Sequence, residues 1–200
     1  TEDRIYKLWE ESGFFNPDVC IEKGITSQDA KPYTIIMPPP NANGRLHVGH
    51  GLTFALQDIL TRYHRMNGYK TLWVPGADHA GFETQIVYEK KLEKEGRSRF
   101  DMDPKDLYKE IYDFTIESKK FMEADVRRLG ASCDWSREKF TLDPDVVKAA
   151  QQTFDKMFKD NLIYRGDRIV NWCAKHQTSL SEVETESIEK TDPFYYLQYG

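Results

Sequence analysis

The sequence predicts an α/β fold with a parallel sheet, and three patterns support this. Residues 33–37 form a short apolar, β-branched run between two prolines, which is typical of a buried strand. Apolar residues at helical spacing occupy positions 52–66, and the pattern ends at Gly68. A second apolar run, at positions 69–74, stops at a Pro-Gly pair. Strand, helix and strand within about 40 residues make a βαβ unit, which requires parallel strands and a right-handed crossover.

The chain after the second strand is predicted to be mainly helical. The pattern of residues 81–96 predicts one helix that ends at a glycine. Residues 103–130 predict a long helix, because Asp103 can act as its N-cap and a proline occupies the first turn. Residues 143–161 repeat this Asp-Pro start and place apolar side chains at helical spacing. We therefore expect three helices after the βαβ unit.

The last part of the sequence is predicted to return to β-structure. Residues 162–173 alternate around Gly166 and Asp167, which predicts a hairpin. Residues 193–200 are typical of a strand that is cut short. This pattern suggests that the chain is a piece of a longer protein.

Composition describes a globular protein of moderate size. The 200 residues are 39% hydrophobic and 30% charged, which allows a real core and no long disordered tail. No apolar run reaches the roughly 18 residues of a membrane span, and the charged N-terminus is unlike a signal peptide. Three widely spaced cysteines favour a reducing cytoplasm. The net charge of −5 argues against a domain that binds nucleic acid through overall positive charge.

The segment between the first strand and its helix, residues 38–50, is the main candidate site. Ligands of open parallel sheets bind at the carboxyl ends of the strands. His47 and His50 are three residues apart, so both imidazoles lie on one face of the first helical turn. The free N–H groups and the dipole of that turn attract anions. Gly49 between them keeps side-chain bulk away, so a flat ligand can approach the backbone.

Other interpretations of these histidines stay open. They could simply cap the helix, or bind a metal, although this HxGH segment lacks the third ligand and the acidic partner of a zinc site. Asp78 is a second candidate, because it follows the second strand in a loop whose glycines permit close approach. Its alternative is an ordinary turn residue. Cys173 and His176 could form half of a zinc site, but a buried cysteine beside a surface histidine is the preferred interpretation.

Three stretches together carry a resemblance to a known family. PPPNANGRLHVGH, at residues 38–50, resembles the signature of the class I aminoacyl-tRNA synthetases, whose HIGH motif reads HVGH here. Residues 62–85, with their DHAG loop, and YRGDRIVNWC at 164–173 are similar to the valyl branch of that family. The likeness covers nearly all of residues 5–200. It implies the N-terminal half of a Rossmann-like catalytic domain that is interrupted by insertions. The domain would have helical additions and a hairpin that leads to an insertion.

The resemblance also implies domain boundaries and residue roles. Residues 1–32 would be an N-terminal extension, 33–191 the first half of the catalytic domain, and 192–200 the start of an inserted editing domain. His47 and His50 would bind the ATP phosphates and stabilise charge on the α-phosphate, with Gly49 near the adenine. Asp78 would pair with the amino group of the amino acid. Three further residues would line the amino-acid pocket: Pro39, Pro40 and Asn41.

The activity implied is ATP-dependent activation of L-valine to valyl-adenylate, followed by transfer to tRNA(Val). Mg²⁺ would accompany the ATP, editing would lie in the insertion, and the full-length enzyme would be a cytoplasmic monomer. The sequence contains no KMSKS-like lysine loop, so this stretch is expected to bind substrates more readily than it turns them over.

Alternatives within and outside this family remain. Asn43 stands where the valyl pattern has threonine, and NANG at 41–44 is similar to the isoleucyl enzyme, whereas the DHAG loop favours the valyl enzyme. A non-catalytic nucleotide- or tRNA-binding fragment and a nucleotidyltransferase are the other hypotheses. Binding of ATP without discrimination among amino acids would favour the non-catalytic one.

Overall fold

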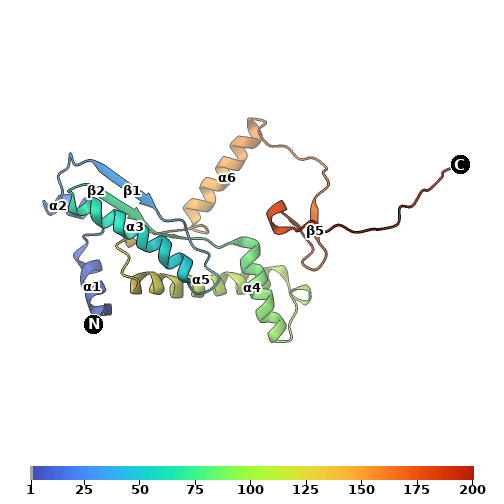
Figure 1. Ribbon diagram of the computed structural model, residues 1–200, viewed down its shortest axis with the longest axis horizontal. Coiled ribbons are helices and arrows are strands. Elements are labelled where there is room, and N and C mark those ends of the chain that lie inside the picture. Colours follow the sequence, from blue (N-terminus) through green and yellow to red (C-terminus); the bar gives the residue numbers. More distant parts are fainter. Residues whose placement is uncertain (1) are drawn as a thin grey trace. The chain divides into compact units, whose positions relative to one another are not determined.

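The computed structural model describes residues 2–200, which fall into two compact units (Figure 1). The first unit ends at Gln152 and the second begins at Thr153. Two pairs of parallel strands lie in the first unit, and one antiparallel pair lies in the second. The candidate residues 38–50 and Asp78 therefore belong to the first unit.

The predicted βαβ unit is confirmed. β1 (Pro32–Ile36) pairs in parallel with β2 (Lys70–Val74), in the register that places Thr34 opposite Leu72. α3 (Val48–Met66) connects the two strands and lies along them (Figure 1). The prolines after β1 cannot donate to a ladder, so the strand ends before them and the chain turns toward α3.

Two shorter strands continue this arrangement beyond β1 and β2. β3 (Gly76–Ala77) pairs in parallel with β4 (Lys139–Phe140). An isolated parallel bridge joins Asn41, which follows β1, to Asp78, which follows β3. The segments that leave the two predicted strands are thus held side by side, where ligands bind in open α/β sheets.

A core cluster lies between α3, the strands and the end of α5. Its buried members are Met37, Phe54, Trp73, Val126, Ala131 and Cys133. The side chain of Trp73 is fully buried, and its indole N–H donates to Gln57 Oε1 at 3.0 Å. A second cluster, beside the Asn41–Asp78 bridge, contains Ala42, Ala77, Met122 and Phe140. Each cluster contains a residue in or next to the segment at 38–50, namely Met37 in the first and Ala42 in the second.

The helices predicted after the βαβ unit are confirmed. The further α-helices are α1 (Glu2–Ser12), α2 (Pro17–Glu22), α4 (Gly81–Lys94), α5 (Pro104–Arg128) and α6 (Pro144–Lys159). Short 3₁₀ turns occupy Arg99–Asp101, Trp135–Arg137 and Glu182–Glu184. Asp103 caps α5 as expected, since its carboxylate accepts from Lys105 N at 2.8 Å. α1 is tied to the core by Tyr6, whose hydroxyl donates to Ala131 O at 2.8 Å.

The second unit differs from the sequence prediction in two places. The hairpin predicted for residues 162–173 is wrong: β5 (Asn171–Cys173) pairs antiparallel with β6 (Thr178–Leu180), so the turn lies at 174–177. Gln177 in this turn has φ 50°, a left-handed conformation that alternation of side chains does not reveal. The strand predicted at 193–200 is also wrong, because no strand pairs with this segment among residues 2–200.

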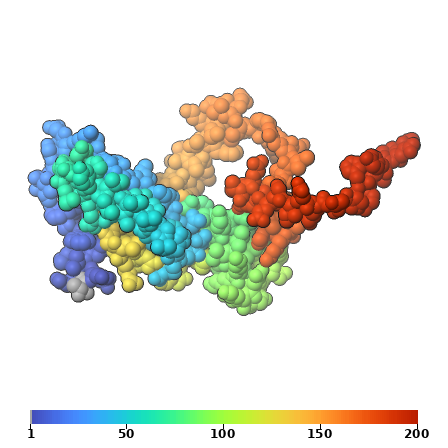
Figure 2. All heavy atoms as spheres, viewed as in Figure 1, coloured from blue at the N-terminus to red at the C-terminus, as the bar shows by residue number. Residues whose placement is uncertain are grey.

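α3 carries apolar side chains on two faces. Phe54 is buried on the strand pair. The opposite face stays exposed and holds Val48, Leu52, Leu56, Ile59, Tyr63 and Met66. Figure 2 shows this helix, in teal, open along the visible side of its unit. Within residues 2–200, none of the helices is both long and apolar enough to cross a membrane.

Candidate active site

α3 begins with a capping box built from two histidines. His47 is the N-cap residue, and its Nδ1 accepts from Gly49 N at 3.1 Å. The Nδ1 of His50 accepts from His47 N at 3.3 Å. Serine or threonine with glutamate or glutamine usually makes these two contacts. The two histidines therefore do cap the helix, and the second nitrogen of each ring stays available for a ligand.

This cap determines which ring nitrogen carries the proton. A nitrogen that accepts a hydrogen bond is unprotonated, so each neutral ring of His47 and His50 carries its proton on Nε2. Within residues 2–200, no hydrogen bond involves either Nε2 atom. The ring centroids lie 4.0 Å apart, so two N–H donors stand together at a helix N-terminus. This arrangement suits an anion such as a phosphate group.

Stability is expected to depend on pH through His50. Partial burial and the neighbouring His47 lower the pKa of His50 below its usual 6.5. The folded chain therefore binds fewer protons than the unfolded chain, and stability falls as pH drops from above 6.5 toward the lowered pKa. We expect urea unfolding between pH 8 and pH 5 to show this loss, and His50→Gln, which keeps an acceptor at the same position, to lose less. Equal losses in both proteins would contradict this role of His50.

Gly49 is required by the cap itself. A Cβ at this position would lie 2.9 Å from Cε1 and 3.1 Å from Nδ1 of His47. Gly49→Ala is therefore expected to push the His47 ring off its cap, which costs about 1 kcal/mol of stability. Gly51→Ala is the matched control, because a Cβ there meets nothing within 4 Å. Urea denaturation would detect the difference, and equal stabilities of the two variants would contradict the prediction.

A groove of about 390 Å³ joins these histidines to the segment that leaves β1. It is lined by Pro38, Pro39, Pro40, Asn41, Asn43, Arg45, Leu46, His47, His50, Thr53 and Phe54. Five of the predicted site residues are thus brought together in one cavity. Sequence reasoning missed Thr53 and Phe54 as lining residues, although they follow His50 at helical spacing and could have been found from it.

Asp78 is held next to this groove by its backbone. Asp78 N donates to Pro40 O at 2.9 Å, and Ala42 N donates to Asp78 O at 2.7 Å. These two bonds form the parallel bridge with Asn41. Asp78 does not line the groove itself, but its backbone is fastened to residues on both sides of Asn41. The structure therefore brings together the two predicted parts of the site.

The Asp78 side chain is half-exposed and has one oxygen in use. Its Oδ1 accepts from Ala80 N at 2.9 Å and lies 3.3 Å from Thr141 Oγ1. Ala80 has φ 55°, a left-handed conformation that costs a non-glycine residue roughly 1 kcal/mol or more. A strained backbone conformation of this kind persists only where the surrounding contacts enforce it, and such conformations are frequent at functional sites. Among residues 2–200, no hydrogen bond involves Asp78 Oδ2.

Comparison with known proteins assigns the chain to a family. A profile described as tRNA synthetases class I (I, L, M and V) matches residues 4–198. The chain belongs to this family. Proteins named valine--tRNA ligase are 45% identical in Clostridium acetobutylicum and 44% identical in Psychrobacter arcticus, each over 99% of this chain. A relative from Arabidopsis thaliana, named valine--tRNA ligase, chloroplastic/mitochondrial 2, is 42% identical over 100% of this chain.

The chain spans only about a fifth of the length of these relatives, at 22%, 19% and 20%. A crystal structure of a ternary LeuRS–tRNA–LeuAMS complex from Agrobacterium radiobacter K84 has a similar fold, with a TM-score of 0.64 and 26% identity. The match covers 84% of this chain and 20% of that chain. The predicted α/β fold of a class I synthetase is therefore confirmed.

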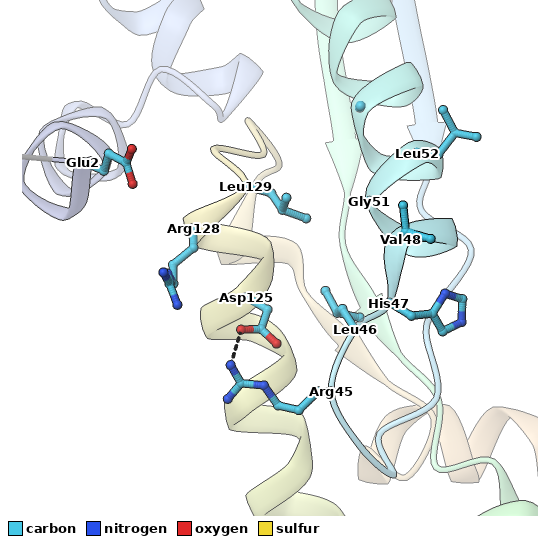
Figure 3. Close-up of a pocket in the computed structure, with 11 residues that line it drawn as sticks. Glu2, Arg45, Leu46, His47, Val48, Gly51, Leu52, Asp125, Arg128 and Leu129 are labelled. Atoms are coloured by element: carbon cyan, nitrogen blue, oxygen red, sulfur yellow. Dashed lines mark hydrogen bonds and ion pairs between the residues drawn. The ribbon is translucent and has the colours of Figure 1, made fainter.

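A second, larger groove of about 800 Å³ lies between α3 and α5 of this class I chain (Figure 3). Arg45 stands at its edge and donates to Asp125 Oδ1 at 2.9 Å. Figure 3 shows the His47 ring pointing away from Asp125 and α5. The histidine ring thus faces away from α5, although His47 lines both grooves together with Arg45 and Leu46. Sequence reasoning did not select Arg45, and no pattern in the sequence marks it.

The possible metal ligands of this class I chain lie in the second unit. Cys173 Sγ is 3.2 Å from His176 Nδ1, so the hairpin brings the predicted pair together. In the part of the chain that the structure describes, no three or more His, Cys, Asp or Glu side chains form a group that could hold a metal ion. Two ligands supply only half of a tetrahedral zinc site.

Proposed function

We propose that this chain is the ATP- and valine-binding part of a valine--tRNA ligase. The observation that carries the proposal is the Asn41–Asp78 backbone bridge, which holds the loop that carries the Asp78 carboxylate beside the groove that contains His47 and His50. The groove offers N–H donors for phosphate, and the carboxylate offers a counter-charge for an ammonium group. The names of the relatives support valine as the amino acid.

The proposed reaction begins with amino-acid activation. A carboxylate oxygen of L-valine attacks the α-phosphorus of ATP in line, the bond to the bridging oxygen breaks, and pyrophosphate leaves with its electrons. The Nε2–H groups of His47 and His50 would donate to the oxygens on which negative charge builds up. Asp78 would hold the valine ammonium, so that the attacking oxygen is positioned at the phosphorus. Mg²⁺ would arrive with ATP and neutralise part of its charge.

The second step is transfer of the valyl group to the 3′ end of tRNA(Val). This step, editing and the stabilisation of pyrophosphate are proposed for the whole protein, since the chain covers about a fifth of its relatives. Threonine, which carries a hydroxyl where valine has a methyl group, is the known difficult competitor of a valine pocket. For this reason we propose an editing activity for the whole protein, in an insertion that begins at residues 192–200.

A cytoplasmic setting and an optional zinc site complete the proposal. The three cysteines are free thiols in the structure, which agrees with a reducing compartment. Cys173 and His176 would supply two zinc ligands if further ligands came from outside this chain.

Titration of the chain with adenylate analogues tests the proposal. Non-hydrolysable valyl-, threonyl- and isoleucyl-adenylate analogues and AMP would be compared by isothermal calorimetry. We expect the valyl form to bind most tightly, the threonyl form similarly or more weakly, and the isoleucyl form poorly. Preference for the isoleucyl form would indicate an isoleucyl enzyme. Asn43, which lines the groove, belongs to the segment that is similar to that enzyme. Equal affinity for all forms and for AMP would favour a non-catalytic nucleotide-binding protein.

A further inference from the structure

The hydroxyl of Thr141 lies between the side chains of Asp78 and His79. Its Oγ1 is 2.9 Å from His79 N, 2.6 Å from His79 Nδ1 and 3.3 Å from Asp78 Oδ1. Thr141 follows β4, and its own N–H donates to Ala77 O at 3.1 Å, which fixes its backbone beside β3. A residue more than sixty positions downstream is thus placed on the loop that carries Asp78.

The numbers of protons and lone pairs limit the possible hydrogen bonds among Thr141, His79 and Asp78. The Thr141 hydroxyl can donate one proton and accept two hydrogen bonds. The backbone N–H of His79 uses one of its lone pairs. If His79 carries its ring proton on Nδ1, that proton uses the second lone pair, and the hydroxyl proton goes to Asp78 Oδ1. All groups are then satisfied, because an ionised Asp78 has only acceptors.

The other arrangement is less favourable. If Nδ1 of His79 carries no proton, the single hydroxyl proton goes to Nδ1 over 2.6 Å, and Asp78 loses its contact with Thr141. Hydrogen bonds to charged acceptors are about twice as strong as those between neutral groups. The carboxylate therefore favours the chain of bonds from His79 Nδ1–H through Thr141 to Asp78.

We propose that Thr141 is a positioning residue for amino-acid recognition in the activation step. It acts through Asp78: together with Ala80 N it holds Oδ1, so that Oδ2 is turned toward the incoming ammonium group. This inference rests on the proposed function, in which Asp78 binds the amino group of valine. The segment after β4 carries no recognisable site motif. Through Thr141 it would nevertheless contribute to amino-acid specificity at this site.

Half-exposure of Asp78 explains why positioning is needed. Its side chain is 38% exposed, so water competes for both oxygens and the carboxylate could turn about its last bond. Two donors, Ala80 N and Thr141 Oγ1, limit this rotation, and His79 Nδ1 lies 3.5 Å from the same oxygen. Fixed geometry strengthens contact with the ammonium. If Thr141 only stabilised the loop, its hydroxyl would affect binding of ligands with and without an amino group equally.

Two variants and two ligands separate these roles. Thr141→Val keeps the shape of the side chain and removes the hydroxyl, and Thr141→Ser keeps the hydroxyl. Each would be titrated with a valyl-adenylate analogue and with the isovaleryl-adenylate analogue, which lacks only the amino group. We expect Thr141→Val to weaken the valyl analogue about tenfold, to leave the isovaleryl analogue unchanged, and Thr141→Ser to bind like the wild type. Circular dichroism would confirm that both variants fold.

A ligand-free measurement tests the same arrangement. The ¹⁵N shifts of the His79 ring are expected to report a proton on Nδ1 in the wild type and in Thr141→Ser, and a mixture of tautomers in Thr141→Val. A proton on Nε2 in the wild type would overturn the inference, as would equal weakening of both analogues or no weakening in Thr141→Val. If the wild type binds both analogues equally, the proposed amino-group site fails, and the inference fails with it.

Discussion

Asp78→Asn is expected to weaken binding of a valyl-adenylate analogue by about 30- to 1,000-fold, or roughly 2–4 kcal/mol. Asparagine keeps an oxygen that can accept from Ala80 N and Thr141 Oγ1, so the loop is expected to stay in place. What is lost is the negative charge opposite the ammonium group. The amide also points a donor toward a cation, which adds repulsion.

Calorimetry on the purified chain would measure this loss, with AMP as the control ligand. AMP has no ammonium group from an amino acid, so its affinity is expected to be the same in wild type and Asp78→Asn. Unchanged affinity for the valyl analogue would show that Asp78 does not bind the amino group. A parallel loss of AMP binding would show that the variant has damaged the groove.

Trp73→Ala is expected to destabilise the first unit by about 3–5 kcal/mol. Trp73 is fully buried between α3, the strands and α5, so its removal leaves a large cavity. The variant also leaves the side-chain oxygen of Gln57 without the indole donor it has at 3.0 Å. A loss of this size is a large part of the total stability of an ordinary domain.

Urea denaturation would measure the change as a shift of the unfolding midpoint. Trp172→Ala is the control, since the side chain of Trp172 is 61% exposed and its removal is expected to change little. A small effect of Trp73→Ala, similar to that of Trp172→Ala, would contradict the assignment of Trp73 to the centre of the core.

Local patterns were sufficient to predict the βαβ unit and the position of the histidines. β1 and β2 are short apolar runs bounded by proline and glycine, and α3 starts where the turn residues end. The candidate site residues on these elements come together because the carboxyl ends of adjacent parallel strands meet. Asp78 could be selected on the same argument.

Other features depend on contacts that sequence periodicity does not report. β3 and β4 contain two residues each, which is too short for an alternation of apolar and polar side chains to predict them. Because β4 was not predicted, Thr141, which follows it, could not be placed beside Asp78. In α3, periodicity identified the helix but not which of its two apolar faces covers the strands. The position of the hairpin turn was missed because it depends on the left-handed conformation of Gln177.

A crystal structure of the chain with a bound valyl-adenylate analogue would show whether Asp78 and the two histidines bind one ligand. We expect the amino nitrogen within hydrogen-bond distance of the Asp78 carboxylate, and the phosphate mimic within hydrogen-bond distance of Nε2 of His47 or His50. The side chain of the valyl group would then lie near Pro40 and Asn41. An analogue bound in the larger groove between α3 and α5, with its amino group away from Asp78, would show that Asp78 is not the amino-group ligand.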